Sequence, residues 1–214
     1  MGFRKKNANE ILIKFNTDHP KISISKEKIL EILYNARIYI AFYYKDKYIL
    51  EDISTHNKYE YFSVDESDFV KINGKILWVI GVLNNNTYEL RLEVSYTRTE
   101  EVLKKIIQTH VKTGNYIVSD GWSVYLWIGR PFSGYIHSPH NHGHGNFGQS
   151  YDSTSHIEGI WSFLKTIIKS IYKIIPDENF ILFLREAEFR RNVNKFNNNK
   201  KWIEFVDILK YKHD

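Results

Sequence analysis

The spacing of apolar residues in the first part of this chain is helical. From Ser25 onward they recur every three or four positions, which predicts a helix that Ser25 caps. These apolar positions are Ile29, Ile32, Leu33, Ala36, Ile40 and Phe42. A turn followed by such a helix also occurs in helix-turn-helix motifs, whose second helix enters the major groove of DNA. We therefore interpret residues 1–57 as a helical, helix-turn-helix-like region, with an ordinary packing helix as the alternative.

From residue 58 the apolar period changes to two. The segments 59–65, 75–83 and 87–95 alternate in polarity, which predicts three consecutive strands. Asn73-Gly74 is a strong hairpin signal between the first two strands, and three consecutive asparagines predict the next turn. The pattern therefore predicts an antiparallel meander, with Asp65 near the end of its first strand.

A helix and a fourth strand follow the meander. Residues 97–111 form an amphipathic pattern that a threonine caps and Gly114 stops. Residues 115–120 predict a strand that joins the same sheet and ends at Asp120. The next predicted elements are a short helical piece at 123–128 and a strand near 134–138. The expected fold class is α/β, with a mixed sheet flanked by helices.

The rest of the chain is predicted to be helical after one long polar loop. Residues 139–155 are rich in Gly, Asn, Ser and His, which indicates a mobile or ligand-ordered loop. Helices are predicted at about 154–172, at about 177–193 and, after a polar linker, at 202–212. We place the α/β domain at 58–196 and the linker with its C-terminal helix at 197–214.

Composition and charge narrow the class of protein. The 214 residues include no cysteine, which excludes disulfides, thiolate zinc sites and cysteine nucleophiles. No apolar stretch approaches the roughly 20 residues that span a bilayer, and no signal-peptide core is present, so we expect a soluble intracellular protein. The net charge of +5 is distributed as +4 over residues 1–58, −3 over 59–158 and +4 over 159–214. An acidic centre between basic ends fits a cation site whose basic surroundings bind a polyanion, and ordinary fluctuation of the charge along the chain is the alternative.

Three acidic residues lie at positions suited to metal-dependent phosphodiester chemistry. Asp65 and Asp120 each follow a short β-type run, and Glu158 opens an amphipathic helix. Divalent cations such as Mg²⁺ prefer oxygen ligands, and two cations that share carboxylates activate the attacking oxygen and stabilise the leaving one. Asp65 and Glu66 point to opposite faces of a strand, so one of them faces such cations, and strand parity alone does not choose between them.

The helix that contains Glu158 also offers cations. At about 100° per residue, one narrow sector of this helix contains Glu158, Ser162, Lys165 and Lys169. Lys165 lies about two turns after Glu158, which suits contact with a DNA phosphate. A surface glutamate with solvated lysines is the alternative interpretation.

The order of several short motifs resembles the DDE transposases of the Merlin superfamily and the related bacterial ISXO-type insertion-sequence transposases. The family's signature is V-D-E, W-V-x-G, S/T-D-G/E-W, an N-H loop with N-F, and I-E-G-x-W-S-x-L-K. In this chain the motifs stand at 64–66, 78–81, 119–122, Asn141-His142 with Asn146-Phe147, and 157–165. Glu186, Phe189, Arg190 and Asn192 are similar to the family's closing helix. The resemblance covers about residues 59–195, with 38 positions from Asp120 to Glu158 and 7 from Glu158 to Lys165.

This resemblance implies an RNase H-like fold and a DNA transposase. It implies that Asp65, Asp120 and Glu158 are the catalytic acids and bind Mg²⁺ or Mn²⁺, with two ions expected. The implied reaction is hydrolysis at the element ends, followed by attack of the freed 3′-hydroxyl on target DNA. The residues expected to contact DNA or its phosphates are Lys165, Lys169, His142 and Arg190.

The resemblance also implies partners and a location. The expected partners are double-stranded DNA, as terminal inverted repeats and as target, and further copies of the chain on that DNA, without a membrane. The expected location is intracellular and DNA-associated, which means the nucleus of a eukaryote or the cytoplasm and nucleoid of a bacterium.

One departure from the family keeps other functions open. Family members often begin with a cysteine zinc ribbon, which this chain lacks. A transposase-derived DNA-binding protein without cleavage activity is therefore the alternative, and a stand-alone RNase H-like nuclease is a third possibility.

Histidines and tryptophans near the motifs invite further interpretations. For His137, His140, His142 and His144 a zinc site, a DNA-contacting or catalytic-loop role, and simple solvation remain open. We interpret Trp78, Trp122 and Trp161 as core or site-wall residues, with base stacking as the alternative.

Overall fold

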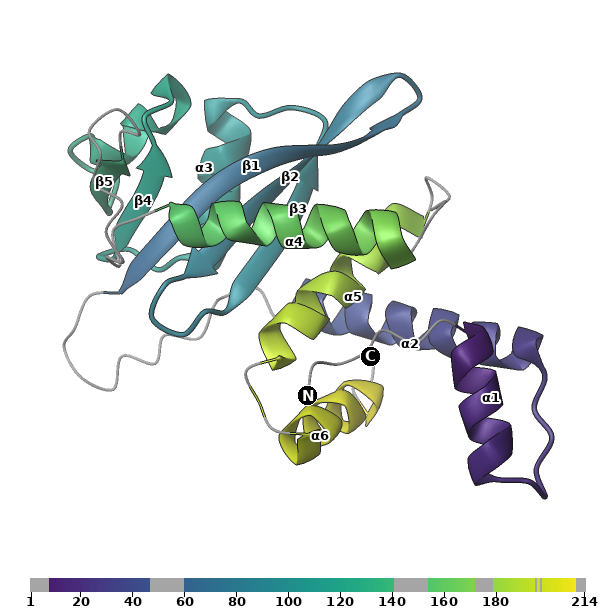
Figure 1. The fold of residues 1–214 in the computed structure, drawn as a ribbon. Helices are drawn as coiled ribbons and strands as arrows, with labels where there is room; N and C mark the ends of the chain where they lie inside the picture. Colours follow the sequence, from purple (N-terminus) through teal and green to yellow (C-terminus); the bar gives the residue numbers. More distant parts are fainter. Residues whose placement is uncertain are drawn as a thin grey trace.

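The structure is a computed structural model of the chain and describes residues 8–46, 60–140, 154–171, 179–194, 196 and 198–210 (Figure 1). Its helices are α1 (Ala8–Asp18), α2 (Lys26–Asp46), α3 (Glu100–His110), α4 (Ser155–Ile171), α5 (Phe180–Val193) and α6 (Asn198–Lys210), with a 3₁₀ helix η1 (Ser123–Gly129). Its strands are β1 (Tyr61–Ile72), β2 (Lys75–Asn84), β3 (Leu90–Ser95), β4 (Tyr116–Asp120) and β5 (Ile136–His140).

The described strands form one sheet in the order β3-β2-β1-β4-β5. The first three are antiparallel neighbours, whereas β4 is parallel to β1 and β5 is parallel to β4. The chain therefore builds the meander first, crosses over through α3 and adds β4 beside β1 (Figure 1). This strand order and these directions are those of the RNase H-like fold, so the predicted α/β class with a mixed sheet is confirmed.

The β1–β2 hairpin is longer than its sequence pattern predicts. Asn73 and Gly74 both adopt positive φ, of 50° and 77°, as a tight two-residue hairpin turn requires. However, β1 continues to Ile72, so the prediction that this strand ends near Asp65 is wrong. The strand runs on because β2 pairs with it as far as the turn, with one irregularity between Asp68 and Val70. Asp65 consequently lies in the middle of a long strand rather than at its end.

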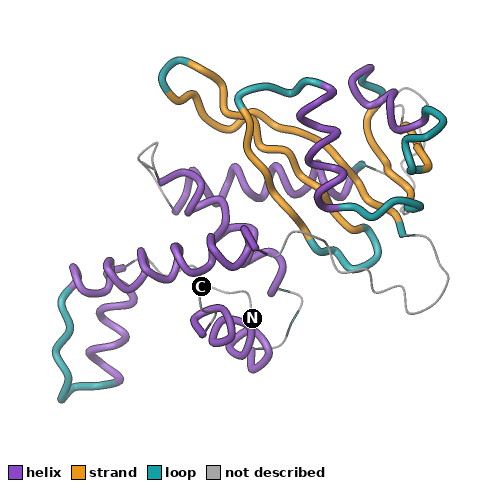
Figure 2. The backbone as a smooth tube through the Cα atoms, turned by 180° about the vertical axis from the view of Figure 1, so that it is seen from behind, coloured by secondary structure: helices purple, strands orange, loops and turns teal. Residues whose placement is uncertain are grey.

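Helices cover both faces of the sheet and bury a hydrophobic core on each. On one face, Leu103 and Ile107 of α3 pack with strand residues such as Val64 (Figure 2). On the other face, Ile160 of α4 packs with residues such as Val79 (Figure 1). Burial of each such aliphatic side chain contributes about 1.5–3 kcal/mol to stability. The side chains of successive strand residues point into opposite cores, which explains why β2 is apolar at nearly every position.

The N-terminal helices are attached to the sheet domain through α5. Ser25 caps α2 as predicted, since its hydroxyl oxygen accepts a hydrogen bond from the Lys28 backbone N–H at 3.2 Å. A third hydrophobic cluster joins α2, α5 and α6 and contains Ile40, Tyr44, Phe189 and Ile208. The helix-turn-helix interpretation of residues 1–57 stays a prediction, and residues 47–57 lie outside the described residues. Among the described helices, none has the length and apolar character needed to cross a membrane.

Candidate active site

Asp65 and Asp120 come together on two neighbouring parallel strands. In the register of β1 and β4, Ser63 lies beside Val118, and each aspartate follows two positions later on its own strand. Because side chains alternate along a strand, two positions further on means the same face. The negative charge of Asp120 is one of the influences that raise the pKa of Asp65, as expected for close carboxylates. The structure thus brings together two of the three predicted acids.

Asp65 is a carboxyl group that resists ionisation. Burial is the main cause that raises its pKa, from 3.8 to about 6, and the charges of Glu66 and Asp120 act in the same direction. Hydrogen bonds from Trp161 and from the Glu66 backbone partly oppose this shift. A carboxylate in such surroundings is stabilised by any cation that approaches it. Oxygen ligands with this property fit Mg²⁺ or Mn²⁺.

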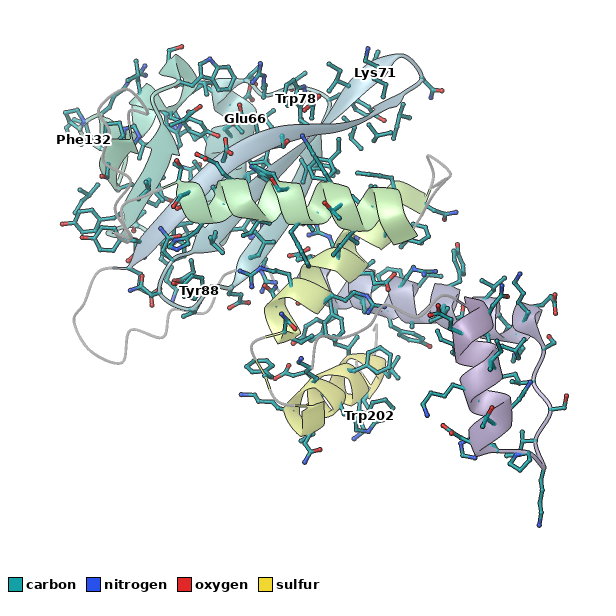
Figure 3. All side chains as sticks on the ribbon, viewed as in Figure 1. Glu66, Lys71, Trp78, Tyr88, Phe132 and Trp202 are labelled. Atoms are coloured by element: carbon teal, nitrogen blue, oxygen red, sulfur yellow. The ribbon has the colours of Figure 1, made fainter. Side chains whose placement is uncertain are left out.

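The next residue along β1, Glu66, faces the other side of the sheet. Its carboxylate accepts hydrogen bonds from the Tyr125 hydroxyl at 2.6 Å and from the Arg98 guanidinium at 3.0 Å. Figure 3 shows Glu66 and Trp78 on the opposite side of β1 from α4. Glu66 is therefore engaged in packing on the α3 side, and Asp65 is the acid that faces α4.

The approach of α4 to Asp65 depends on a glycine. Gly81 of β2 is paired with Asp65 in the strand register. A Cβ atom at Gly81 would lie 2.7 Å from the Cη2 atom of Trp161 and 3.1 Å from the Cδ1 atom of Ile157. Because glycine has no Cβ, α4 lies close to the sheet here. At this distance the Trp161 indole N–H donates a hydrogen bond of 2.7 Å to Asp65 Oδ2.

Glu158 lies exposed in the first turn of α4, the helix that also carries Trp161. It precedes Trp161 by three positions, which puts both on neighbouring parts of one helix face. Its Oε1 atom accepts a hydrogen bond of 2.8 Å from the Thr154 hydroxyl. Asp120 in turn accepts one of 3.1 Å from the Trp122 backbone N–H. Each acid thus has a local partner, and no three acidic or histidine side chains among the described residues are arranged to hold a metal ion.

The predicted DNA-contacting residues differ in where they lie. Lys165 is on α4, and its side chain is 39% exposed. Its Nζ atom lies 3.4 Å from Asp68 Oδ1, so Lys165 contacts β1 three residues after Asp65. The Lys169 side chain and all of His142 lie outside the described residues. Arg190 pairs with Glu186 at 2.6 Å on α5. The structure therefore places Lys165, but not Arg190, on the helix that carries Glu158.

His137, Trp78 and Trp122 have partners within the sheet domain. His137 Nε2 lies 2.8 Å from the Ser119 hydroxyl, and burial lowers the pKa of this histidine. The His140 side chain and the loop histidines after it lie outside the described residues, so their role stays open. Trp78 and Trp122 pack against the core on the α3 side.

Three contacts of these tryptophans are not predicted by the sequence pattern. The Arg98 guanidinium lies 4.0 Å from the ring centroid of Trp78 and 4.4 Å from that of Trp122. The hydrogen bond from Trp161 to Asp65 was also not predicted. No local signal in the sequence indicates this contact, because Trp161 and Asp65 are 96 positions apart.

Part of the chain matches a known protein family. A family model described as an ISXO2-like transposase domain matches residues 62–192. Comparison with curated proteins finds none that matches.

Several solved structures of retroviral proteins are similar to this chain at low sequence identity. A chain of the simian T-cell lymphotropic virus intasome in complex with PP2A regulatory subunit B56 gamma is 15% identical, with a TM-score of 0.44. The match covers 66% of this chain and 52% of that chain, so this chain spans about half the length of that relative. The HTLV-2 integrase catalytic core domain in complex with magnesium is 13% identical, with a TM-score of 0.39, and the match covers 64% of this chain and 86% of that chain. The BIV integrase catalytic core domain is 15% identical, with a TM-score of 0.43, and the match covers 71% of this chain and 98% of that chain.

Proposed function

The chain belongs to the ISXO2-like transposase domain family, and from this premise we propose that it is a metal-dependent DNA transposase. In the proposed reaction it hydrolyses a phosphodiester at each end of a DNA element and joins the freed 3′-hydroxyl to target DNA. The observation that carries the proposal is the placement of Asp65 and Asp120 two positions beyond the paired residues Ser63 and Val118 on adjacent parallel strands. Asp65 faces α4, which has Glu158 in its first turn.

The three acids are the proposed ligands of the divalent cations. Asp65, Asp120 and Glu158 would be the ligands, and two Mg²⁺ or Mn²⁺ ions bound there would activate the attacking oxygen and stabilise the leaving one. A cation would relieve the repulsion between the carboxylates of Asp65 and Asp120, which burial strengthens. Glu158 would join them by exchanging its hydrogen bond with Thr154 for the cation.

DNA would be the partner of the surface around these acids. Lys165, half-exposed on the same helix, would hold a phosphate of the bound strand and so position the scissile bond. We include Lys169, His142 and Arg190 as further contacts to terminal repeats and target DNA. The proposed active form is a homo-oligomer on paired ends, which acts on DNA inside the cell.

A DNA-binding protein without cleavage activity is the second candidate. Two observations favour it: the chain has no cysteine for a zinc ribbon, and the described acids do not form a three-carboxylate group. This candidate keeps the fold and DNA affinity but lacks the chemistry.

One experiment separates the candidates. The full chain is incubated with Mg²⁺ and a duplex that carries the terminal repeats flanking its gene, beside the variants Asp120→Asn and Glu101→Gln. Glu101 is an exposed acid in the first turn of α3, so its change is the matched control. The proposal expects cuts at the repeat ends that persist in Glu101→Gln and are lost in Asp120→Asn. A bound but uncut duplex supports the second candidate, and degradation that ignores the ends supports a general nuclease.

A further inference from the structure

Trp161 belongs to the hydrophobic core and is also the partner of a candidate catalytic acid. Its side chain is 7% exposed and packs in the cluster between α4 and the sheet. The Phe69 ring meets the indole edge-on, with centroids 5.8 Å apart and an interplanar angle of 74°. The indole ring is therefore fixed by packing before its N–H contributes anything to the site.

Two strands determine where the indole N–H points. The far edge of the ring lies over Gly81 of β2, where no larger residue fits without movement. Asp65 of β1 lies directly beside Gly81 in the sheet, so the N–H of the same ring reaches Asp65 Oδ2 at 2.7 Å. The V-D-E, W-V-x-G and I-E-G-x-W motifs thus meet at one point of the fold.

We propose that Trp161 is a positioning residue that holds the Asp65 carboxylate in the orientation required for cation binding. This inference rests on the proposed function. An indole N–H donates a hydrogen bond and neither accepts one nor carries charge. It therefore fixes one carboxylate oxygen and leaves the negative charge that attracts a cation. A lysine or arginine in its place would neutralise that charge.

The same contact links the position of α4 to the acids. Glu158 lies one helical turn before Trp161, so an indole seated over Gly81 also determines where Glu158 stands relative to β1. Hydrogen-bonding partners of metal ligands typically change metal affinity by about 10- to 100-fold when they are removed. We expect an effect of this size from loss of the indole N–H alone.

The test measures binding of Mn²⁺ alone to the full chain, by the electron paramagnetic resonance signal of free Mn²⁺. Trp161→Phe keeps an aromatic ring and removes the N–H. Trp127→Phe is the matched control, because Trp127 is 3% exposed and its buried N–H has no hydrogen-bond partner among the described residues. We expect Mn²⁺ affinity to fall about 10- to 100-fold in Trp161→Phe and to stay at the wild-type value in Trp127→Phe.

Two results overturn the inference in distinguishable ways. Wild-type affinity in Trp161→Phe, with DNA cleavage intact, removes the positioning role and leaves the proposed function standing. A wild-type chain that neither binds Mn²⁺ nor cleaves DNA removes both.

A second measurement applies if Trp161→Phe does not fold. The indole N–H resonances of the ¹⁵N-labelled wild-type chain are followed while Mg²⁺ is added. We expect one resonance to shift, and the same resonance to be displaced by Asp65→Asn and retained in Trp127→Phe. The inference is overturned if none of the indole N–H resonances changes its chemical shift on addition of Mg²⁺ or in Asp65→Asn.

Discussion

Two consecutive carboxylates of β1 have separate tasks because a strand turns them to opposite faces. Glu66 is buried against Tyr125 and Arg98 on the α3 side, and Asp65 faces α4. The sequence predicts that the two point apart, since side chains alternate on any strand. It does not predict which face α4 covers, because that depends on how the later helix packs on the finished sheet.

The raised pKa of Asp65 predicts a stability effect with a definite sign. Because the pKa rises from 3.8 to about 6 on folding, the stability that this group contributes is fully present below about pH 3.8 and is lost as the pH rises through about 6. Asp65→Asn keeps an acceptor for Trp161 and removes the charge. At pH 8 with EDTA we expect it to raise the free energy of unfolding by on the order of 1–3 kcal/mol.

Urea unfolding at several pH values checks this prediction. The gain from Asp65→Asn should shrink towards zero near pH 4, whereas the exposed control Glu101→Gln should change little at any pH. A variant that is less stable than wild type at pH 8, or a gain that is the same at pH 4 and pH 8, would contradict the burial of Asp65.

The seat of Trp161 on Gly81 predicts a coupling between these two positions. Gly81→Ala should destabilise the chain by about 1–3 kcal/mol, because its Cβ would overlap the indole ring. In a Trp161→Phe background the cost should be clearly smaller, since the two nearest indole atoms, Cη2 and Cζ2, are absent from phenylalanine. A double-mutant cycle from urea unfolding measures this difference. Strict additivity of the two changes would mean that α4 does not rest on Gly81.

At the scale of elements, the residues that are similar to the family's closing helix hold neighbouring elements rather than the candidate acids. The Asn192 side chain accepts a hydrogen bond from the Leu90 N–H at 2.8 Å and donates one to the Leu90 carbonyl at 2.9 Å. Glu186 accepts a hydrogen bond of 2.6 Å from Arg37 of α2. In this way α5 satisfies the backbone of the edge strand β3 and also attaches α2.

The pairing of Asn192 with β3 predicts a large effect of one substitution. Asn192→Ala leaves the Leu90 N–H and carbonyl without this partner in a buried place, which should cost about 2–4 kcal/mol of stability. Asn194→Ala, at an exposed position on the same helix end, should cost less than about 0.5 kcal/mol. Thermal unfolding of both variants checks the prediction. Equal, small shifts in Tm would show that β3 does not depend on α5.

Most elements were predictable from sequence because they depend on local signals. The hairpin at Asn73-Gly74, the Ser25 cap and the order of strands and helices follow from turn chemistry and periodicity. The extent of β1 was not predictable, because its acidic run from Asp65 to Asp68 interrupts the alternation while pairing with β2 continues. Of the candidate site, the acids and the Glu158 face were predicted from spacing and resemblance and stay a prediction. The Trp161 contact requires three elements distant in sequence to meet, which no local signal encodes.

At the scale of the whole molecule, the candidate site lies where the two halves of the sheet meet. The antiparallel meander supplies Asp65 and Gly81, the parallel strand β4 supplies Asp120, and α4 supplies Glu158 and Trp161. The N-terminal helix α2 is packed on α5 and α6 rather than separated from them. We therefore expect α2 to move together with the sheet domain rather than as a separate unit.

The proposed reaction depends on three carboxylates that share divalent cations. A crystal of the full chain grown with Mn²⁺, measured by anomalous diffraction at the manganese edge, tests this most directly. We predict anomalous peaks between the carboxylates of Asp65 and Asp120, with Glu158 turned from Thr154 towards the metal. Peaks elsewhere, or an Asp65–Asp120 pair without manganese at saturating Mn²⁺, would contradict it.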